Sequence, residues 1–223
     1  MKSSFRKLFV ITASVFFVGL LVLMIQWKLT LIPPKTSSQI IINKDFTIGN
    51  LNSKINVTVF EEPSCDNCLK FSDDVFPRIK KRFIDTNLIS YTFIPLSFLF
   101  DSEPAVLASL CVLYSNPSVP NTKLFMKYFY NLLSTEKTEG QAWVTDEILI
   151  KCASDLEIDF SELISCVNSK KYLSQLKANN AYGERLMGNN LATPTVFING
   201  RMIEDISFDE ISRVIYQLQK SEK

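Results

Sequence analysis

The sequence predicts an α/β protein with a mixed β-sheet, helices on the faces of that sheet, and a long helical insertion. Three observations support this prediction. First, a β-rich segment, a helical segment and a second β-rich segment follow one another between residues 55 and 96, as in a parallel βαβ unit. Second, residues 102–188 have a helical pattern. Third, Asn199 and Gly200 form a hairpin signal before a final helix, which adds antiparallel strands to the parallel pair.

Residues 1–28 predict a signal anchor or a signal peptide. Lys2, Arg6 and Lys7 precede residues 8–25, which carry no charge. This run is longer than the roughly 7–15 apolar residues of a cleaved signal, and it reaches the lower edge of the roughly 17–25 that span a bilayer. We therefore favour an uncleaved anchor through residues 8–27. A cleaved signal is the alternative, and a buried core helix is a third reading.

The charges around this segment predict where the rest of the chain lies. Basic residues before the span favour an N-terminus inside the cell and a domain outside, anchored in the cell envelope. If the segment is a cleaved signal, the domain is instead soluble in the periplasm. Both readings export the domain to oxidising conditions. Residues 29–38 contain Pro33 and Pro34 and are expected to form a stiff linker.

The remaining residues, 39–223, are expected to form one domain. The predicted strands are rich in β-branched and aromatic residues and cover 39–42, 55–60, 88–96, 194–198 and 201–203. A helix is predicted over residues 68–84, with Pro77 expected to kink it. The helical insertion covers residues 102–188. Ser207 and Glu210 have the spacing of a capping box and mark the start of the last helix.

Two cysteines stand where the strand 55–60 gives way to the following helix. Cys65 and Cys68 are separated by Asp66 and Asn67, so they can close into a disulfide. Only a thiolate attacks a disulfide, and a helix N-terminus favours the thiolate of Cys65. A structural disulfide and half of a zinc site are the alternatives. The zinc reading needs a second close pair of cysteines, and the other three are scattered.

The composition excludes several classes of function. The chain has no histidine, which rules out Ser-His-Asp and Cys-His catalysis and any histidine-ligated metal. A formal net charge of +1 gives no sign of nucleic-acid binding. Dithiol chemistry requires no cofactor and no metal, so we expect neither.

A second stretch far downstream makes the dithiol more specific. Residues 192–200 read Ala-Thr-Pro-Thr-Val-Phe-Ile-Asn-Gly, and together with residues 48–68, 95–97 and 166–169 they resemble the DsbA-like thiol–disulfide oxidoreductases. The resemblance runs from about Phe46 to Lys220. It implies a thioredoxin-like mixed sheet with an inserted helical subdomain.

The resemblance also implies roles for individual residues. Cys65 would be the exposed nucleophile and Cys68 the buried resolving thiol. Pro194 would be a cis-proline, and the preceding Thr193 would lie against the dithiol and align the substrate backbone. Glu62 falls where the family usually has an acid, three residues before the first cysteine.

Some residues near the dithiol keep two readings. Glu62 is either a solvated acid at the strand end or a partly buried carboxylate that relays the proton of Cys68. Its neighbour Glu61 is expected to be exposed. The aromatic residues are mostly core, although Phe98 and Phe100 would suit an apolar groove for unfolded substrates.

The three cysteines outside the motif leave at least one free thiol. Cys111 lies on an apolar helix, where a buried, inert thiol is the simplest reading. Some relatives tie the first inserted helix to the last, which favours a Cys111–Cys166 disulfide. A Cys152–Cys166 disulfide, closing a short helix-turn-helix, is the local alternative.

The dipeptide between the active-site cysteines departs from the family pattern. Strongly oxidising relatives carry a histidine there, whereas this chain has Asp66, and a nearby anion disfavours a second anion at Cys65. We therefore expect a mild oxidase that exchanges disulfides with extracytoplasmic proteins and is reoxidised by a quinone-linked membrane partner. A reductase or isomerase fed by a membrane thiol donor, and a non-catalytic assembly module, are the alternatives.

Overall fold

The computed structural model describes residues 19–20, 43–116, 119–137, 141–188 and 190–221. The chain divides into two units, residues 1–37 and 38–223. Apart from Gly19 and Leu20, which are helical, the predicted span 8–27, the linker 29–38 and the predicted strand 39–42 lie outside the described residues. Within the described part of the chain, we find no helix with the length and apolar character needed to cross a bilayer.

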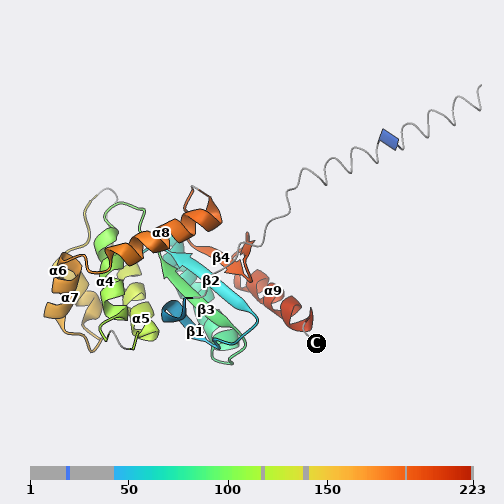
Figure 1. Ribbon diagram of the computed structural model, residues 1–223, viewed down its shortest axis with the longest axis horizontal. Coiled ribbons are helices and arrows are strands. Elements are labelled where there is room, and N and C mark those ends of the chain that lie inside the picture. Colours follow the sequence, from blue (N-terminus) through green and yellow to red (C-terminus); the bar gives the residue numbers. More distant parts are fainter. Residues whose placement is uncertain (1–18, 21–42, 117–118, 138–140, 189, 222–223) are drawn as a thin grey trace, which may run out of the picture. The chain divides into compact units, whose positions relative to one another are not determined.

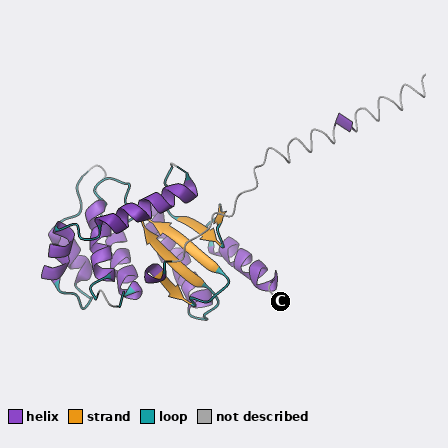
Figure 2. Cartoon of the chain, in the orientation of Figure 1, coloured by secondary structure: helices purple, strands orange, loops and turns teal. Residues whose placement is uncertain are grey.

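The second unit is built on a five-stranded mixed sheet with the strand order β1-β3-β2-β4-β5 (Figures 1 and 2). Its strands are β1 (Thr47–Gly49), β2 (Asn56–Glu61), β3 (Ser90–Pro95), β4 (Thr195–Ile198) and β5 (Arg201–Ile203). β2 and β3 are parallel, and the other neighbouring pairs are antiparallel. The predicted mixed sheet, with its βαβ unit joined to a hairpin, is therefore confirmed.

The helical connection between β2 and β3 is divided into four segments that follow one another without a break. They are α2 (Asp66–Lys70), the π-helical η2 (Phe71–Val75), α3 (Phe76–Ile79) and the π-helical η3 (Lys80–Ile84). The predicted helix thus begins two residues before Cys68. Pro77 lies near the start of α3 and has no N–H to donate to the preceding turn, and π-helical turns flank α3 on both sides.

The helical insertion follows β3 and contains five described helices: α4 (Glu103–Leu113), α5 (Thr122–Leu133), α6 (Asp146–Ala153), α7 (Phe160–Asn168) and α8 (Leu173–Met187). α4 is buried on nearly every side because it lies between two cores. Val106 and Leu110 pack into the core under the sheet, whereas Ala108 and Val112 pack into the core of the insertion. A helix that is apolar all round is typical of such a position.

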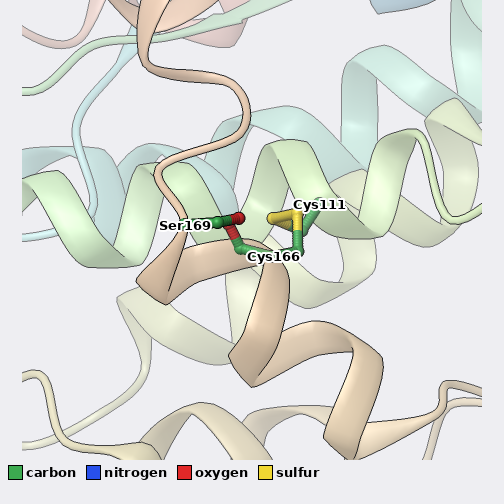
Figure 3. Close-up of a disulfide and its surroundings, with 3 residues drawn as sticks. All are labelled: Cys111, Cys166 and Ser169. Atoms are coloured by element: carbon green, nitrogen blue, oxygen red, sulfur yellow. A yellow bond between two sulfur atoms is a disulfide. The ribbon is translucent and has the colours of Figure 1, made fainter.

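A disulfide ties this insertion together. Cys111 on α4 and Cys166 on α7 are bonded, with Cα atoms 6.1 Å apart (Figure 3). Of the two pairings left open by the sequence, this is therefore the one that forms, and the reading of Cys111 as an inert free thiol is wrong. Cys152 remains a buried free thiol.

The two faces of the sheet have different cores. Val57 and Val59 of β2 face the large core formed with α2, α3, α5 and the C-terminal helix α9 (Phe208–Ser221). Phe60 and Phe197 point to the opposite face, where Tyr182 of α8 packs on them. Because side chains alternate along a strand, this division also fixes the side on which residue 61 lies.

The C-terminal hairpin has the geometry that its sequence predicts. Asn199 and Gly200 both have positive φ, 47° and 79°, as a type I′ turn requires. Asn199 also fastens the turn to β2, because its Oδ1 accepts the Asn56 N–H at 2.7 Å. The predicted capping box is present in part, since the Glu210 N–H donates to Ser207 Oγ at 3.3 Å.

Candidate active site

The dithiol lies where β2 passes into α2. Cys65 is the N-cap residue of α2, and its Sγ accepts the N–H of Cys68 at 3.3 Å. Cys65 is half-buried, whereas Cys68 is completely buried in the core beneath it. One sulfur is therefore accessible to another protein, and the other is reached only through the first.

Local hydrogen bonds favour the thiolate form of Cys65. Its pKa is lowered to about 6, chiefly by hydrogen bonding from the Cys68 side chain, against an opposing effect of burial. The Thr193 side chain and the Cys68 backbone N–H contribute further lowering. Asp66, the acid between the two cysteines, is exposed to solvent. Solvent screens an exposed charge.

The buried thiol has the opposite character. Burial raises the pKa of Cys68 well above its ordinary value, and the hydrogen bond to Cys65 raises it further. Near neutral pH the pair therefore holds one thiolate, on Cys65, and one protonated thiol, on Cys68. This asymmetry separates an attacking sulfur from a resolving sulfur.

The downstream motif reaches the dithiol through the sheet. β4 pairs with β2 so that Thr195 lies opposite Phe60, which brings the residues just before β4 to the end of β2. The Thr193–Pro194 peptide bond is cis, and Cys65 Sγ lies 3.3 Å from the Thr193 carbonyl oxygen, to which it donates when it is a thiol. Residues 128 positions apart are thus in direct contact, as the resemblance implies.

Glu62 is buried, and the reading of this residue as a solvated acid at the strand end is wrong. Its side chain has no exposed surface, and its Oε2 accepts the Ser64 N–H at 2.6 Å. Burial raises its pKa to about 7, although hydrogen bonds from Ser102, Ser64 and the Leu99 backbone oppose that shift. Glu62 therefore connects the approach to Cys65 with the loop that follows β3.

Glu61 is also fully buried, so the expectation that it is exposed is wrong. It is the last residue of β2, and strand alternation places it on the same face as Val57 and Val59, beneath the helix that carries Cys68. Burial raises the pKa of this carboxyl well above its ordinary value, and the nearby Cys65 charge adds to the effect.

The insertion contributes a wall beside the dithiol that sequence reasoning did not find. Trp143 Nε1 donates to Ser64 Oγ at 3.1 Å, one residue before Cys65. The Asp101 carboxylate accepts the backbone N–H groups of Trp143 and Val144 at 2.7 and 3.0 Å. The Lys137 ammonium lies 4.9 Å from the centre of the Trp143 ring. No motif marks these residues, because they meet only in the folded chain.

An exposed apolar segment follows β3 on this side of the molecule. Phe98, Leu99 and Phe100 expose 38%, 40% and 65% of their surface. The segment is held in place because Asn180 of α8 donates to the Ser97 carbonyl at 2.7 Å and accepts the Ser97 N–H. Large apolar side chains on a fixed loop can contact an unfolded chain.

Among the described residues, no three potential metal ligands gather into one group.

These features agree with the relatives of the chain. A family model described as thioredoxin matches residues 42–217. The chain therefore belongs to the thioredoxin family, and within it to the DsbA-like protein thiol–disulfide oxidoreductases, as the following comparisons show.

The crystal structure of DsbA from Chlamydia trachomatis is 46% identical, with a TM-score of 0.77, over 84% of this chain and 98% of that one. Oxidised BdbD from Bacillus subtilis is 26% identical, with a TM-score of 0.69, over 78% of this chain and 92% of that one.

Two curated proteins complete the comparison. Disulfide bond formation protein D of Bacillus subtilis is 28% identical over 75% of this chain and 74% of its own length. A protein of Rickettsia typhi named as a protein-disulfide oxidoreductase is 27% identical over 78% of this chain. This chain covers 61% of the length of the Rickettsia typhi relative.

Proposed function

We propose that this protein is an exported thiol–disulfide oxidoreductase and acts as a mild oxidase on the thiols of extracytoplasmic proteins. The observation that carries the proposal is the pairing of an accessible Cys65, whose pKa is about 6, with a fully buried Cys68 and the cis Thr193–Pro194 peptide. A low pKa makes Cys65 a good leaving group, which favours giving the disulfide away.

The reaction proceeds by two exchanges. A substrate thiolate attacks Cys65 Sγ, the Cys65–Cys68 bond breaks, and the electron pair goes to Cys68 Sγ, which takes up a proton. A second substrate thiolate then attacks the substrate sulfur of the mixed disulfide, and Cys65 leaves as a thiolate. The substrate loses two electrons and gains a disulfide, while the enzyme is reduced to the dithiol.

The surroundings of Cys65 suit a protein substrate. In this proposal the Thr193 backbone aligns the extended substrate chain beside the sulfur, and Pro194 keeps that carbonyl in place. Phe98 and Phe100 contact apolar side chains of the substrate. Glu62 holds the loop that carries them, and so acts as a positioning residue.

The location and the partners of the enzyme rest on the sequence. The apolar residues 8–27 anchor the chain with its domain outside, or are removed as a signal that releases it into the periplasm. A quinone-linked membrane oxidase restores the Cys65–Cys68 disulfide. If electrons flow the other way, a membrane thiol donor takes its place.

The reduction potential of the purified protein, equilibrated with glutathione, tests the direction of transfer. We expect a value between the roughly −120 mV of a strong oxidant such as DsbA and the roughly −270 mV of thioredoxin. A value at or below that of thioredoxin would make the protein a reductase. A value equal to that of DsbA would contradict a mild oxidase.

Substitution of the two cysteines separates catalysis from client binding. Cys68→Ser should accumulate mixed disulfides with envelope proteins, because nothing resolves them within the enzyme, and Cys65→Ser should lose all activity. Cys152→Ser is the matched control, since this free thiol lies in the core of the insertion. If Cys65→Ser keeps its biological activity, the protein is a non-catalytic assembly module.

A further inference from the structure

When the active-site disulfide opens, the buried sulfur of Cys68 needs a proton. When the Cys65–Cys68 bond breaks, the electron pair stays on Cys68, whose side chain has no exposed surface. A thiolate without water or a charged partner is unstable there, and burial raises the pKa of Cys68 accordingly. The proton must therefore come from a group within the core.

Glu61 is a buried acid on the correct face of the sheet. Both carboxyl oxygens are buried, and within the described part of the chain neither has a hydrogen-bond partner. Glu61 and Cys68 interact electrostatically. Glu62 differs in part: its Oε2 accepts the Ser64 N–H at 2.6 Å, and only its Oε1 is buried without a partner. A buried polar group without a partner calls for an explanation, and a role in the chemistry is one of the few available.

Two tyrosines of the same core share this feature. The hydroxyls of Tyr91 on β3 and Tyr130 on α5 are buried, and neither has a partner of full hydrogen-bond geometry among the described residues. They interact with each other and with Glu61. Phe76 fixes their positions, because its ring centre lies 5.3 Å from that of Tyr91 and 5.2 Å from that of Tyr130.

Tyr130 also reaches the surface. Its ring is only partly buried and lines a groove of about 850 Å³ between α5, the helix after β2 and strand β1. Ile48, Phe76 and Met126 line the same groove, together with Lys80 and Lys127. The hydroxyl of Tyr130 is therefore buried, while the residue also lines the groove.

We propose that Glu61, Tyr91 and Tyr130 form a buried proton-exchange unit that supplies Cys68 with its proton and is refilled from the groove beside α5. The inference rests on the proposed thiol–disulfide exchange and adds a proton path to it. It also moves the proton relay expected at Glu62 to its neighbour. Tyr91 and Tyr130 act through Glu61 and are positioning residues.

The step balances without any further reactant. The substrate sulfur bonds to Cys65, the Cys65–Cys68 bond breaks, and the Glu61 carboxyl gives its proton to Cys68 Sγ. Glu61 is then a carboxylate and takes a proton from a tyrosine hydroxyl. That hydroxyl is refilled by the other tyrosine and by water in the groove, since a hydroxyl both donates and accepts. The titratable groups that face Glu61 are Cys65 at the N-cap of α2, Cys68 in α2, Tyr91 in β3 and Tyr130 in α5.

The rate of disulfide opening tests the role of Glu61. The oxidised full-length protein is mixed with excess dithiothreitol between pH 5 and 8, and the rate is divided by the concentration of attacking thiolate. For Glu61→Gln we expect opening about 10²-fold slower than in the wild type and independent of pH, because general acids contribute at least roughly this factor. Glu61→Asp should recover much of the rate and the pH dependence.

Exchange of the Glu61 proton tests the tyrosines. After transfer to D₂O, the infrared band of the protonated carboxyl, identified by its loss in Glu61→Gln, should shift at least 10-fold more slowly in Tyr91→Phe and Tyr130→Phe. Tyr128→Phe is the matched control: it removes a buried hydroxyl from the same helix, but one that donates to the Leu149 carbonyl at 3.1 Å, in the core of the insertion.

The outcomes distinguish the proposals. If Glu61→Gln opens at the wild-type rate with the wild-type pH profile, the proton-exchange unit is wrong, while trapping by Cys68→Ser would still support the oxidoreductase. If Tyr91→Phe and Tyr130→Phe exchange as fast as Tyr128→Phe, the path to the groove is wrong. Absence of trapping would instead overturn the proposed function itself.

Discussion

Two adjacent carboxyls beside the dithiol differ in the direction of their side chains and in their hydrogen bonding. Glu61 ends β2 on the face that carries Val59, whereas Glu62 turns toward Ser64 and the loop after β3. Both are fully buried, and burial raises the pKa of both. Only Glu62 has hydrogen bonds that offset part of that cost.

The raised pKa of Glu62 predicts how stability depends on pH. The protonated form is favoured in the folded state, so this contribution is complete below about pH 4.5 and is lost as the pH rises through about 7. In Glu62→Gln the free energy of unfolding should therefore fall less between low and high pH than in the wild type. The difference should be at most about 3 kcal/mol, at about 1.4 kcal/mol per pKa unit. Urea unfolding at pH 4.5 and pH 7.5 measures it.

A matched control comes from Glu147, an exposed acid in the first turn of α6 whose pKa is lowered. In Glu147→Gln the free energy of unfolding should fall between the two pH values by as much as it does in the wild type. If Glu62→Gln also leaves it unchanged, Glu62 does not titrate in this range and its burial must be offset by stronger hydrogen bonds than those described.

Among the elements, α4 and α7 are joined by the feature most open to a direct test. The Cys111–Cys166 disulfide closes a loop of 55 residues and lies beside Ser169, whose Oγ donates to the Cys166 carbonyl at 3.0 Å (Figure 3). Removing a native disulfide typically costs about 2–5 kcal/mol. Cys111→Ala together with Cys166→Ala should therefore lower the free energy of unfolding by that amount, measured in urea.

The dithiol should not respond to this change, because Cys65 lies in the other core. The thiolate absorbance of Cys65 should titrate near pH 6 in both proteins. Cys152→Ala is the control for the loss of a thiol from the same core. An unchanged unfolding free energy in the double variant would show that helix packing alone holds α4 and α7 together.

At the scale of the whole unit, the insertion and the sheet meet at the active site. Asp101 lies just before α4 and holds the backbone of Trp143, which in turn contacts Ser64 next to Cys65. Asp101 has a positive φ of 57°, a conformation that Asp and Asn tolerate better than most residues. One side chain therefore fixes both the loop and the wall beside the dithiol.

Replacing this side chain should loosen the wall. Asp101→Ala leaves two N–H groups without their acceptor and should cost about 1–3 kcal/mol in unfolding free energy. Asp101→Asn keeps an acceptor oxygen and the backbone preference, so it should retain most of the stability. Chemical denaturation of the two variants checks this. Equal losses would mean that the negative charge, rather than the hydrogen bonds, carries the contribution.

The sequence by itself determined the local features of this protein. The strand before Cys65, the helix after it, the type I′ turn at Asn199 and Gly200 and the cap at Ser207 all depend on neighbours a few residues away, and the structure has each of them. The motif around Pro194 was informative for another reason. Its residues resemble a family in which the contact with the dithiol is known.

Only the tertiary structure decided which distant side chains meet. The pairing of Cys111 with Cys166, the burial of Glu61 and Glu62 and the contact of Trp143 with Ser64 each depend on the packing of helices against the sheet. A carboxylate at a strand end is solvated or buried according to what covers it. That cover comes from residues far away in the chain, and no local pattern encodes it.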